Sequence, residues 1–267
     1  MPEGHTLHRL ALDHDRRFGG ETVRVASPQG RFAAEAKRLD GREFLGADAW
    51  GKHLWHRYDG GLTVHVHLGL YGSFADFELL DGAPPAPVGQ VRMRIVGPRD
   101  GTDLRGPTAC HLVSEEQIDE VLARLGPDPL RADADPDPAW RRISRSRRPI
   151  GALLMDQKVV AGVGNVYRAE VLYRAGLDPH REGRALGRED FDGIWADLVA
   201  LMPIGVERGR MHVVRAEDDH GAPSYAPDRP RTYVYRRAGE PCRVCRTPVR
   251  TEVMEARNLY WCPTCQT

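Results

Sequence analysis

The sequence lacks any long apolar segment. No stretch approaches the roughly 18 consecutive apolar residues that a membrane helix needs, and the N-terminus has no apolar core of the kind that a signal peptide carries. Beyond two similar cysteine turns, it also lacks internal repeats and long low-complexity tracts. We therefore expect a cytoplasmic protein without a membrane partner, and its 267 residues, 41% of them hydrophobic, suffice for two domains or for one domain with appendages.

The sequence also lacks a net charge, which by itself neither favours nor excludes an acidic partner. Its arginines are unevenly distributed. Five lie in the segment RRISRSRR (141–148), directly after an acidic run at 133–137, and seven lie in residues 229–250 against one acid, Glu240. Such basic regions are typical either of a surface that binds a polyanion or of an ordinary solvated face. Charge alone leaves both alternatives open.

Cysteine is scarce, but four of the five cysteines fall in two Cys-x-x-Cys pairs. Cys242 and Cys245 form the first pair, Cys262 and Cys265 form the second, and sixteen residues separate the pairs. Two such turns at the ends of a short hairpin can hold one metal ion in a tetrahedral thiolate site, and zinc is the metal we expect. Disulfides are the less favoured alternative, because the chain has no signal peptide. Cys110 is left over, and we expect it to be an ordinary packing residue.

Residues 21–110 predict strands, because apolar and polar residues alternate there between glycines and prolines. The preceding residues, 4–18, predict a helix, and Ser114 to Gln117 has the form of a capping box before another helix. The segment LGPDPL (125–130) predicts a domain boundary. Beyond it we expect two helical runs within 150–176, joined by a glycine-containing turn at 160–164, and a further helix over 188–208.

Asn165 stands where the second of those runs begins. Glycines in the preceding turn let the backbone approach another group closely, and exposed amides at the start of a helix suit a phosphate. Small residues between two packed helices are, however, also common at simple tight corners.

The N-terminus places two potentially reactive groups next to each other. If Met1 is removed, which a small following residue usually permits, Pro2 presents a free secondary amine next to the carboxylate of Glu3. The two groups combine a potential nucleophile with a potential proton carrier. A glutamate at this position could instead do no more than complement the dipole of the helix that follows.

Together these motifs resemble the Fpg/Nei family of DNA glycosylase/AP lyases, and within it the actinobacterial endonuclease VIII proteins. The resemblance is carried by PEG (2–4), GKH around Lys52, HLGLYG (67–72), LGPDPL (125–130), MDQKVVAGVGNVYRAE (155–170), YVYRRAGEPCRVC and ARNLYWCPTCQ. It implies an α+β multidomain fold. The parts are an N-terminal β-sandwich with an N-terminal helix (1–127), a helix-two-turn-helix domain (128–230) and a C-terminal four-cysteine zinc finger built on a β-hairpin (231–267).

The resemblance also implies base excision repair by a monomer that binds damaged DNA and holds one structural zinc. The Pro2 amine attacks C1′ of the damaged nucleotide and displaces the base, and β,δ-elimination from the resulting Schiff base then nicks the strand. Glu3 carries protons, and Lys52, the third catalytic residue, contacts the phosphate next to the lesion and assists proton transfer. An α-amine suits the nucleophilic role because its reference pKa is about 7.7–8.0, against about 10.4 for lysine.

Asn165 and Arg257 match the family residues that hold the same phosphate, for which a guanidinium can donate two parallel hydrogen bonds. The zinc holds this arginine in place without touching the reaction. One departure from the family pattern is Ala256, since a glycine usually precedes this arginine. The resemblance therefore leaves the shape of the finger turn open.

The lesion class depends on the residues that fill the space left by an extruded base. Leu70 and Tyr71 resemble the filling pair of endonuclease VIII, whereas purine-specific members carry HLGMSG there. Pro107 stands where those members have an aromatic residue. We therefore expect oxidised pyrimidines as substrates. Oxidised purines remain the alternative. Arg105 aligns with the arginine that contacts the orphan base in the purine enzymes, which leaves the opposite-base preference open.

Two other classes of protein are less consistent with the sequence. A non-catalytic zinc-ribbon protein that binds DNA would explain the cysteines and arginines but not the PEG terminus. A small tautomerase with an N-terminal proline would explain the terminus, but such chains are short and have no metal-binding ribbon.

Overall fold

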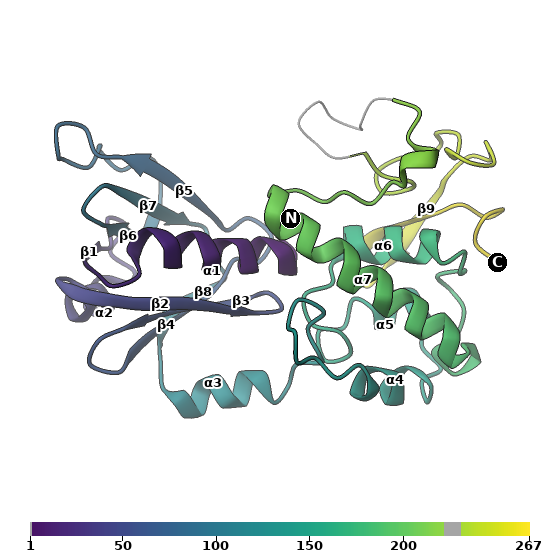
Figure 1. Cartoon of the computed structure of the whole chain (residues 1–267), viewed down its shortest axis with the longest axis horizontal. Helices are drawn as coiled ribbons and strands as arrows, with labels where there is room; N and C mark the ends of the chain where they lie inside the picture. Colours follow the sequence, from purple (N-terminus) through teal and green to yellow (C-terminus); the bar gives the residue numbers. More distant parts are fainter. Residues whose placement is uncertain (1, 222–230) are drawn as a thin grey trace. The chain divides into compact units, whose positions relative to one another are not determined.

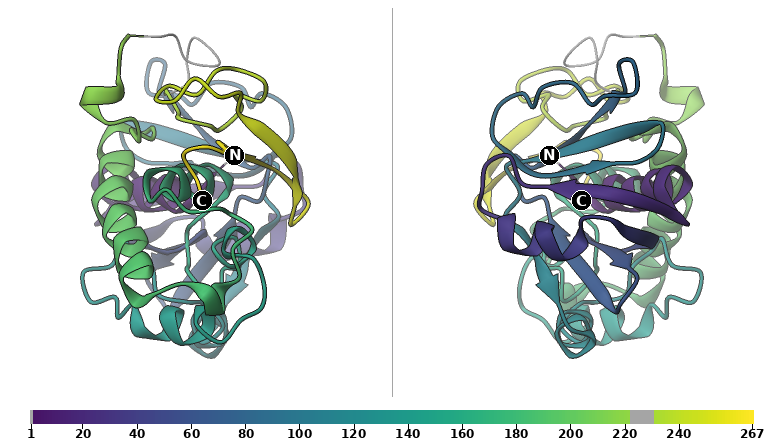
Figure 2. Two further views of the ribbon diagram at one scale, coloured as in Figure 1. Left: turned by 90° about the vertical axis from the view of Figure 1, so that its right-hand side faces the viewer. Right: turned by 90° about the vertical axis from the view of Figure 1, so that its left-hand side faces the viewer.

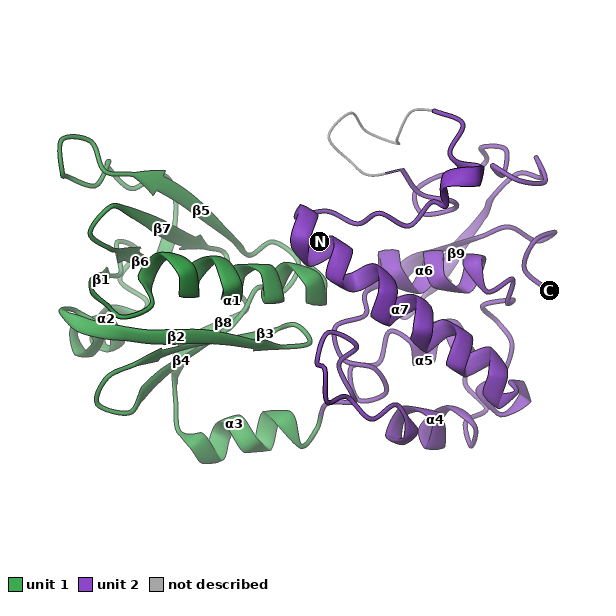
Figure 3. Ribbon diagram, viewed as in Figure 1, with its two compact units in different colours: residues 1–124 green, residues 125–267 purple. Residues whose placement is uncertain are grey.

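The computed structural model describes residues 2–221 and 231–267, and the chain divides into two compact units, residues 1–124 and residues 125–267 (Figure 3). Met1, whose removal is expected from the sequence, and part of the linker before the cysteine hairpin lie outside the described residues. The first unit contains α1 (Gly4–Phe18), β1 (Glu21–Ala26), α2 (Ala33–Leu39), β2 (Arg42–Trp50), β3 (His53–Tyr58), β4 (Leu62–His67), β5 (Ser73–Glu78), β6 (Val91–Val96), β7 (Asp100–Arg105), β8 (Ala109–Val113) and α3 (Glu115–Leu122) (Figure 1). The second contains α4 (Asp137–Ile143), α5 (Ile150–Leu153), α6 (Asn165–Arg174), the short 3-10 helix η1 (Gly183–Ala185), α7 (Arg188–Arg208), a second one, η2 (Ala216–Asp218), β9 (Arg250–Met254) and β10 (Arg257–Trp261).

The eight strands of the first unit are antiparallel and follow the order β5-β7-β6-β1-β2-β3-β4-β8. The first half of β1 pairs with β2, where Val23 lies opposite Arg42, and its second half pairs with β6, where Val25 lies opposite Ile95. Figure 2 shows the purple strand β1 between the teal strands on one side and the blue strands on the other. Because β1 passes from one sheet into the other, both sheets can enclose one core. The expected β-sandwich is confirmed.

Alternation along these strands places apolar side chains on the inner faces. Leu54, Val64 and Ile95 are fully buried there, and α1 adds Leu7 and Phe18. Burying a side chain of this size contributes about 1.5–3 kcal/mol, so the amphipathic helix and both sheets stabilise one another. The helix expected over residues 4–18 is confirmed, and Cys110 lies in the same core.

A short helix, α2, interrupts the region that was expected to contain only strands. Its sequence, AAEAKRL, consists of residues with high helix propensity. The helix buries Ala36 and Leu39 against the sandwich core, and this tertiary contact stabilises a segment too short to form a helix alone.

The capping box at Ser114 is confirmed, since its side chain accepts a hydrogen bond from Gln117 N–H and the Gln117 side chain accepts one from Ser114 N–H. The helix expected over 188–208 is present as α7. The first helical run after residue 150 is shorter than expected, because α5 ends at Leu153 and an extended turn follows. In the described part of the chain, no helix combines the length and apolar character needed to cross a membrane.

Candidate functional site

Pro2 and Glu3 lie immediately before α1. Glu3 is the N-cap residue, with extended backbone (φ −122°, ψ 177°), and its carbonyl accepts a hydrogen bond from Thr6 N–H at 2.9 Å. The Glu3 residue is fully buried, whereas Pro2 is partly exposed. By contrast Glu35, an acid in the first turn of α2, is partly exposed. A buried carboxylate next to a partly exposed proline is an unusual arrangement for a residue that only complements a helix dipole.

Lys52 lies in the tight turn between β2 and β3. Trp50 and His53 are paired across this turn, and Gly51 has a φ of 57°, a left-handed conformation that glycine adopts without steric cost. The partly exposed Lys52 is thereby held at the tip of a two-stranded hairpin. The pKa of His53, next along the chain, is lowered to about 3, mainly by burial, so this imidazole is neutral beside the lysine at neutral pH.

The packing of α1 on β2 places Glu3 and Lys52 at the same end of the first unit (Figure 1). The C-terminal end of α1 is fixed near the start of β2, because Gly20 N–H donates to Phe44 O at 2.8 Å. Further along, His14 Nδ1 lies 2.9 Å from His56 Nε2, and His56 is paired with Ala47 of β2. The helix from His14 back to Glu3 and the strand from Ala47 on to Lys52 are each about 17 Å long. Glu3 and Lys52 therefore lie at the same end of the first unit.

Leu70 and Tyr71 lie in the tight loop between β4 and β5. The loop is closed by a hydrogen bond from Gly72 N–H to Leu68 O at 3.0 Å. Gly69 is required in it, because a Cβ at that position would lie 1.9 Å from Thr108 Oγ1. The loop exposes both large side chains, Leu70 to 41% and Tyr71 to 87%. An apolar side chain and an aromatic ring at a loop tip are suited to insertion into another molecule.

Arg105 and Pro107 lie beside this loop. Arg105, the last residue of β7, is paired with Ser73 at the start of β5, and it makes an ion pair with Asp103 at 3.5 Å. His67, the last residue of β4, is paired with His53, so the loop also lies at the end of the sheet that bears Lys52. The structure therefore brings the site residues expected in the first unit to one end of it.

In the second unit, Gln157 fastens the turn between α5 and α6. Its side-chain amide nitrogen donates to Met155 O at 3.0 Å and to Val163 O at 2.9 Å, and its Oε1 accepts from Gly162 N–H at 3.0 Å. These bonds give the backbone carbonyl and N–H groups of the turn the hydrogen-bond partners that they would have within a helix. They explain why the first helical run ends early and why α6 begins at Asn165.

Asn165 is buried at the start of α6 and connects it to the cysteine hairpin. Its Nδ2 donates to Asn258 O at 2.9 Å, and its Oδ1 accepts a hydrogen bond from Arg168. Arg168 is fully buried and also donates to Gly151 O and Met254 O, each at 3.4 Å. One guanidinium thus fixes the Asn165 amide and joins α5, α6 and β9.

Arg257 is the first residue of β10. Met254 is paired with it across the two-residue turn formed by Glu255 and Ala256, both of which have positive φ angles (54° and 53°). The Arg257 Nη1 donates to Ala256 O at 2.8 Å, while its buried Nε has no partner among the described residues. Because Asn165 donates to the residue that follows Arg257, the structure brings these two predicted residues together.

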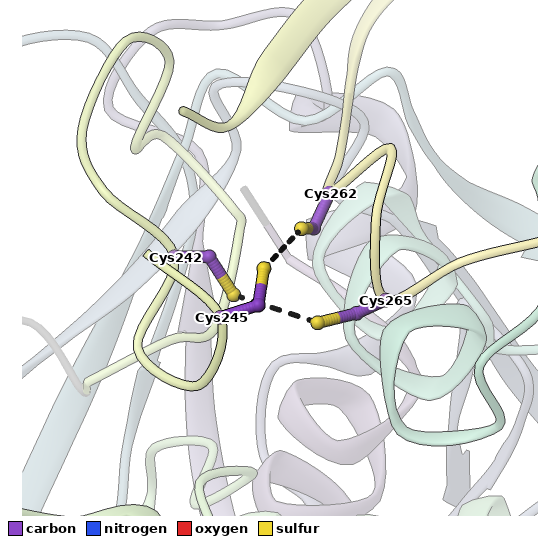
Figure 4. Close-up of side chains that lie close together, drawn as sticks. All are labelled: Cys242, Cys245, Cys262 and Cys265. Carbon is purple, nitrogen blue, oxygen red and sulfur yellow. Dashed lines mark hydrogen bonds between the residues drawn. The ribbon is translucent and has the colours of Figure 1, made fainter. Parts of the chain in front are cut away.

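The four paired cysteines form one cluster (Figure 4). Their four sulfur atoms all lie within 4.8 Å of one another, which fits a tetrahedral thiolate site for zinc. Tyr173 of α6 supports the cluster, since its hydroxyl lies 3.1 Å from Cys242 Sγ and 3.8 Å from Cys265 Sγ. The helix that carries Asn165 thus also contacts the metal ligands.

The fully buried Glu170 makes a further connection between α6 and the segment before the hairpin. Its carboxylate accepts hydrogen bonds from the backbone N–H groups of Tyr233, Val234 and Tyr235 at 2.7 to 3.0 Å. Burial raises the pKa of Glu170, and the three N–H donors oppose this shift. The carboxylate therefore fixes the chain where it enters the cysteine hairpin.

Sequence reasoning did not assign roles to Gln157, Arg168, Glu170 and Tyr173. All four lie within or just after the motif MDQKVVAGVGNVYRAE, and an arginine and a glutamate in an otherwise apolar helix were the available signal. Their partners lie up to 92 residues away, so the contacts themselves could not be read from the motif.

Comparison with known proteins agrees with this architecture. Residues 1–106 match the family described as formamidopyrimidine-DNA glycosylase N-terminal domain, residues 125–216 match the formamidopyrimidine-DNA glycosylase H2TH domain, and residues 239–267 match the zinc finger found in FPG and IleRS. Together these matches cover the sandwich, the helical segment and the cysteine hairpin.

Individual relatives extend over the whole chain. The protein named Endonuclease 8 1 of Mycobacterium tuberculosis is 63% identical over 268 residues, covering 100% of both chains. The crystal structure of MutM (Fpg) from Thermus thermophilus is 30% identical, covers 99% of this chain and 98% of its own, and has a TM-score of 0.78. The Lactococcus lactis Fpg in complex with DNA containing an abasic site has a TM-score of 0.80 at 19% identity, covers 99% of both chains and shows the shared fold. The chain therefore belongs to the Fpg/Nei family of DNA glycosylase/AP lyases, with one structural zinc in its finger.

Proposed function

We propose that this DNA glycosylase/AP lyase removes oxidised pyrimidines during base excision repair. The observation that carries the proposal is the loop between β4 and β5, where Leu70 and Tyr71 are 41% and 87% exposed. An exposed aromatic ring can stack in the space that an extruded base leaves, and such stacking contributes about 1–3 kcal/mol. The 63% identity to a protein named Endonuclease 8 1 supports the same choice.

Pro2 is the nucleophile in this proposal. Its unprotonated amine attacks C1′ of the damaged nucleotide, and the bond from C1′ to the base breaks as the base leaves. The attached nitrogen then loses its proton and the C1′–O4′ bond of the sugar breaks, with Glu3 donating a proton to O4′, so that a covalent iminium forms. A secondary amine gives an iminium without an N–H proton, so its positive charge persists and acidifies the C2′ hydrogen. Loss of that hydrogen expels the 3′ phosphate, and a second elimination expels the 5′ phosphate.

Glu3 moves protons during these steps, and Lys52 contacts the phosphate beside the lesion. Both residues lie at the end of the first unit where the exposed loop also lies. Burial of Glu3 keeps water away from the carboxylate and holds it in one position beside Pro2. A positioned carboxylate of this kind accelerates proton transfer by about 10²–10⁴-fold.

Asn165 and Arg257 hold a DNA phosphate in the same proposal. The guanidinium of the partly exposed Arg257 and the second amide hydrogen of Asn165 are donors on adjacent elements of the second unit. The zinc cluster and Arg168 fix these elements, so the donors keep their spacing before DNA binds. We place the protein in the cytoplasm, as a monomer that associates with the nucleoid when bound to damaged DNA; the family likeness to an Fpg solved with abasic DNA supports the choice of ligand.

Oxidised purines are the second candidate. Arg105 supports this alternative, because it lies beside the Leu70–Tyr71 loop, where it could contact an orphan base, and its buried Nε has no partner among the described residues. Pro107 opposes it, since it stands where the purine-specific members carry an aromatic residue.

Borohydride trapping on a panel of duplexes distinguishes the two candidates. The panel carries thymine glycol, 5-hydroxyuracil, 8-oxoguanine opposite cytosine, or an abasic site. We expect covalent trapping on both pyrimidine lesions and on the abasic site, with much weaker trapping on 8-oxoguanine. Efficient trapping on 8-oxoguanine without trapping on either pyrimidine lesion would assign the chain to oxidised purines instead.

A further inference from the structure

The arginine-rich segment RRISRSRR forms a basic hollow at the end of α4. Three of its arginines and Pro138 line a hollow of about 450 Å³; the arginines are Arg141, Arg142 and Arg145. All three arginines are exposed. Nothing in the chemistry proposed for Pro2 or in the phosphate contacts of the finger uses them.

The acidic run that precedes α4 does not neutralise this hollow. Asp137 makes an ion pair with Arg188 at 2.9 Å, and Asp133 makes one with Arg131 at 3.8 Å. Asp135 accepts a hydrogen bond from the backbone N–H of Asp137 at 2.9 Å. Within residues 2–221 and 231–267, no carboxylate pairs with any of the three arginines of the hollow.

Some neighbouring arginines are paired with carboxylates. Arg148, from the same arginine-rich segment, pairs with both Asp156 and Glu255 at 3.0 Å. A second hollow, in the first unit, is lined by three cations, Lys37, Arg38 and Arg42, but also by the carboxylate of Asp40. The α4 hollow differs from the second hollow because no carboxylate lies among the residues that line it.

A structural role explains only part of this arrangement. Arg141 and Arg142 lie in the last turn of α4, where positive charge complements the helix dipole. Arg145 lies beyond the end of the helix and gains nothing from the dipole. Three guanidinium groups around one hollow repel one another, and a bound polyanion would relieve this repulsion.

The hollow is separate from the arginine of the finger turn. Figures 1 and 2 show α4 on the opposite side of the second unit from the hairpin β9–β10, which carries Arg257. A nucleic acid that contacts only the hairpin and the start of α6 therefore does not reach α4.

We propose that the α4 hollow is a second binding site for nucleic-acid phosphates, remote from the lesion. Guanidinium groups donate paired hydrogen bonds to phosphate oxygens, and three of them can follow consecutive phosphates of one strand. This site adds affinity that does not depend on sequence, and it holds the enzyme on DNA between lesions. The proposal rests on the proposed repair function.

Salt dependence of DNA binding tests the proposal. Each phosphate contact contributes about 0.9 to the slope of log K against log salt concentration. We expect the variant R141A/R142A/R145A to lower this slope by about 2 to 3 on an undamaged duplex of about four helical turns, or about 40 base pairs. On a lesion duplex of about one turn, about 10 base pairs, its binding and cleavage should equal those of the unmodified chain.

The matched control is R31A/R57A/R99A, which removes the same charge from three exposed arginines of the first unit. An unchanged slope for the α4 variant, or an equal loss in the control, would overturn the proposal. A third result would also overturn it: the unmodified chain binds poly-glutamate, the α4 variant does not, and the salt slope for DNA is the same in both. That result assigns an acidic protein partner to the hollow. If the triple variant does not fold, the salt slope is measured for R141Q/R145Q, and we expect it to be lower by about 2. Failure of the repair function itself is read separately, from cleavage of the short lesion duplex by the unmodified chain.

Discussion

Glu3 combines two properties that rarely occur together in a carboxylate at the start of a helix. It is fully buried, and it directly follows the residue whose amine is the proposed nucleophile. A carboxylate that only stabilised α1 would contribute about 0.3–1 kcal/mol and would not need burial. A proton carrier benefits from a fixed position and from exclusion of water.

We therefore expect E3Q to lower kcat for excision of thymine glycol by about 10²–10⁴-fold, because the amide keeps the shape of the side chain but cannot take up or release a proton. Single-turnover cleavage measures the change. E35Q, at a first-turn acid of α2, is the control and should retain full activity. If E3Q stays within twofold of the unmodified chain, Glu3 serves only the helix.

Tyr71 is the most exposed aromatic residue of its loop, and its contribution should depend on the ring and not on the hydroxyl. We expect Y71A to lower kcat/KM for lesion excision by about 5- to 100-fold, the equivalent of about 1–3 kcal/mol of lost stacking. Y71F should retain most of the activity.

The control for the loop is L80A, which truncates another exposed apolar side chain of the first unit, 66% exposed. Equal losses in L80A and Y71A would contradict a specific role for the ring. Retained excision in Y71A would leave Leu70 or Arg105 to fill the vacated space.

Among the elements, the cysteine hairpin contains backbone strain that a single substitution can test. Its two-residue turn needs positive φ at both positions, and Ala256 adopts 53° where the family usually has glycine. A left-handed conformation costs an alanine about 1–2 kcal/mol, partly offset by the greater freedom of glycine in the unfolded chain.

We therefore expect A256G to stabilise the hairpin by about 0.5–1 kcal/mol, measured by hydrogen exchange of the β9 and β10 amides in the zinc-loaded chain. A238G is the control. Ala238 is exposed and has no positive φ, so its replacement should stabilise nothing. Faster exchange in A256G would show that the turn is not strained.

The sequence predicted those elements whose determinants are local. The helices at residues 4–18 and 188–208 follow from apolar spacing, and the capping box at Ser114 follows from two side chains three residues apart. The metal site follows from the spacing of the cysteine pairs. The short helix α2 was missed because its burial against the sandwich, and not its length, makes it stable.

Contacts between distant segments could not be predicted in the same way. Arg168 bonds to a carbonyl 86 residues away, and Glu170 accepts from backbone groups 63 to 65 residues away. Neither partner is a conspicuous residue, since each offers only its backbone. The sequence therefore predicted residues that act on DNA, but it did not predict the residues that hold them in place.

At the scale of the whole molecule, buried histidines make stability depend on pH. His14 and His56 are fully buried and hydrogen-bonded to each other at 2.9 Å. Burial lowers the pKa of His14 to about 3 and holds the pKa of His56 well below 6.5, and Arg17 adds to the first shift. Both are neutral in the folded chain near neutral pH, whereas in the unfolded chain they bind protons below pH 6.5.

Stability is therefore retained above about pH 6.5 and is lost as the pH falls below it, because the unfolded chain then binds more protons. Between pH 7 and pH 5 we expect a loss of about 2 kcal/mol for each of the two histidines. Urea unfolding at each pH, monitored through hydrogen exchange of the β3 amides, measures this loss of stability. The variant H14L/H56L should show a smaller loss over this range, and an equal loss would contradict the assignment.

The claim on which the mechanism depends is that the amine of Pro2 bonds to C1′ of the damaged nucleotide. The direct measurement is peptide mapping by mass spectrometry of the complex reduced with borohydride on a thymine glycol duplex. We expect Met1 to be absent from the active protein and the sugar adduct to lie on the nitrogen of Pro2. An adduct on Lys52, or full activity in protein that retains Met1, would contradict the mechanism.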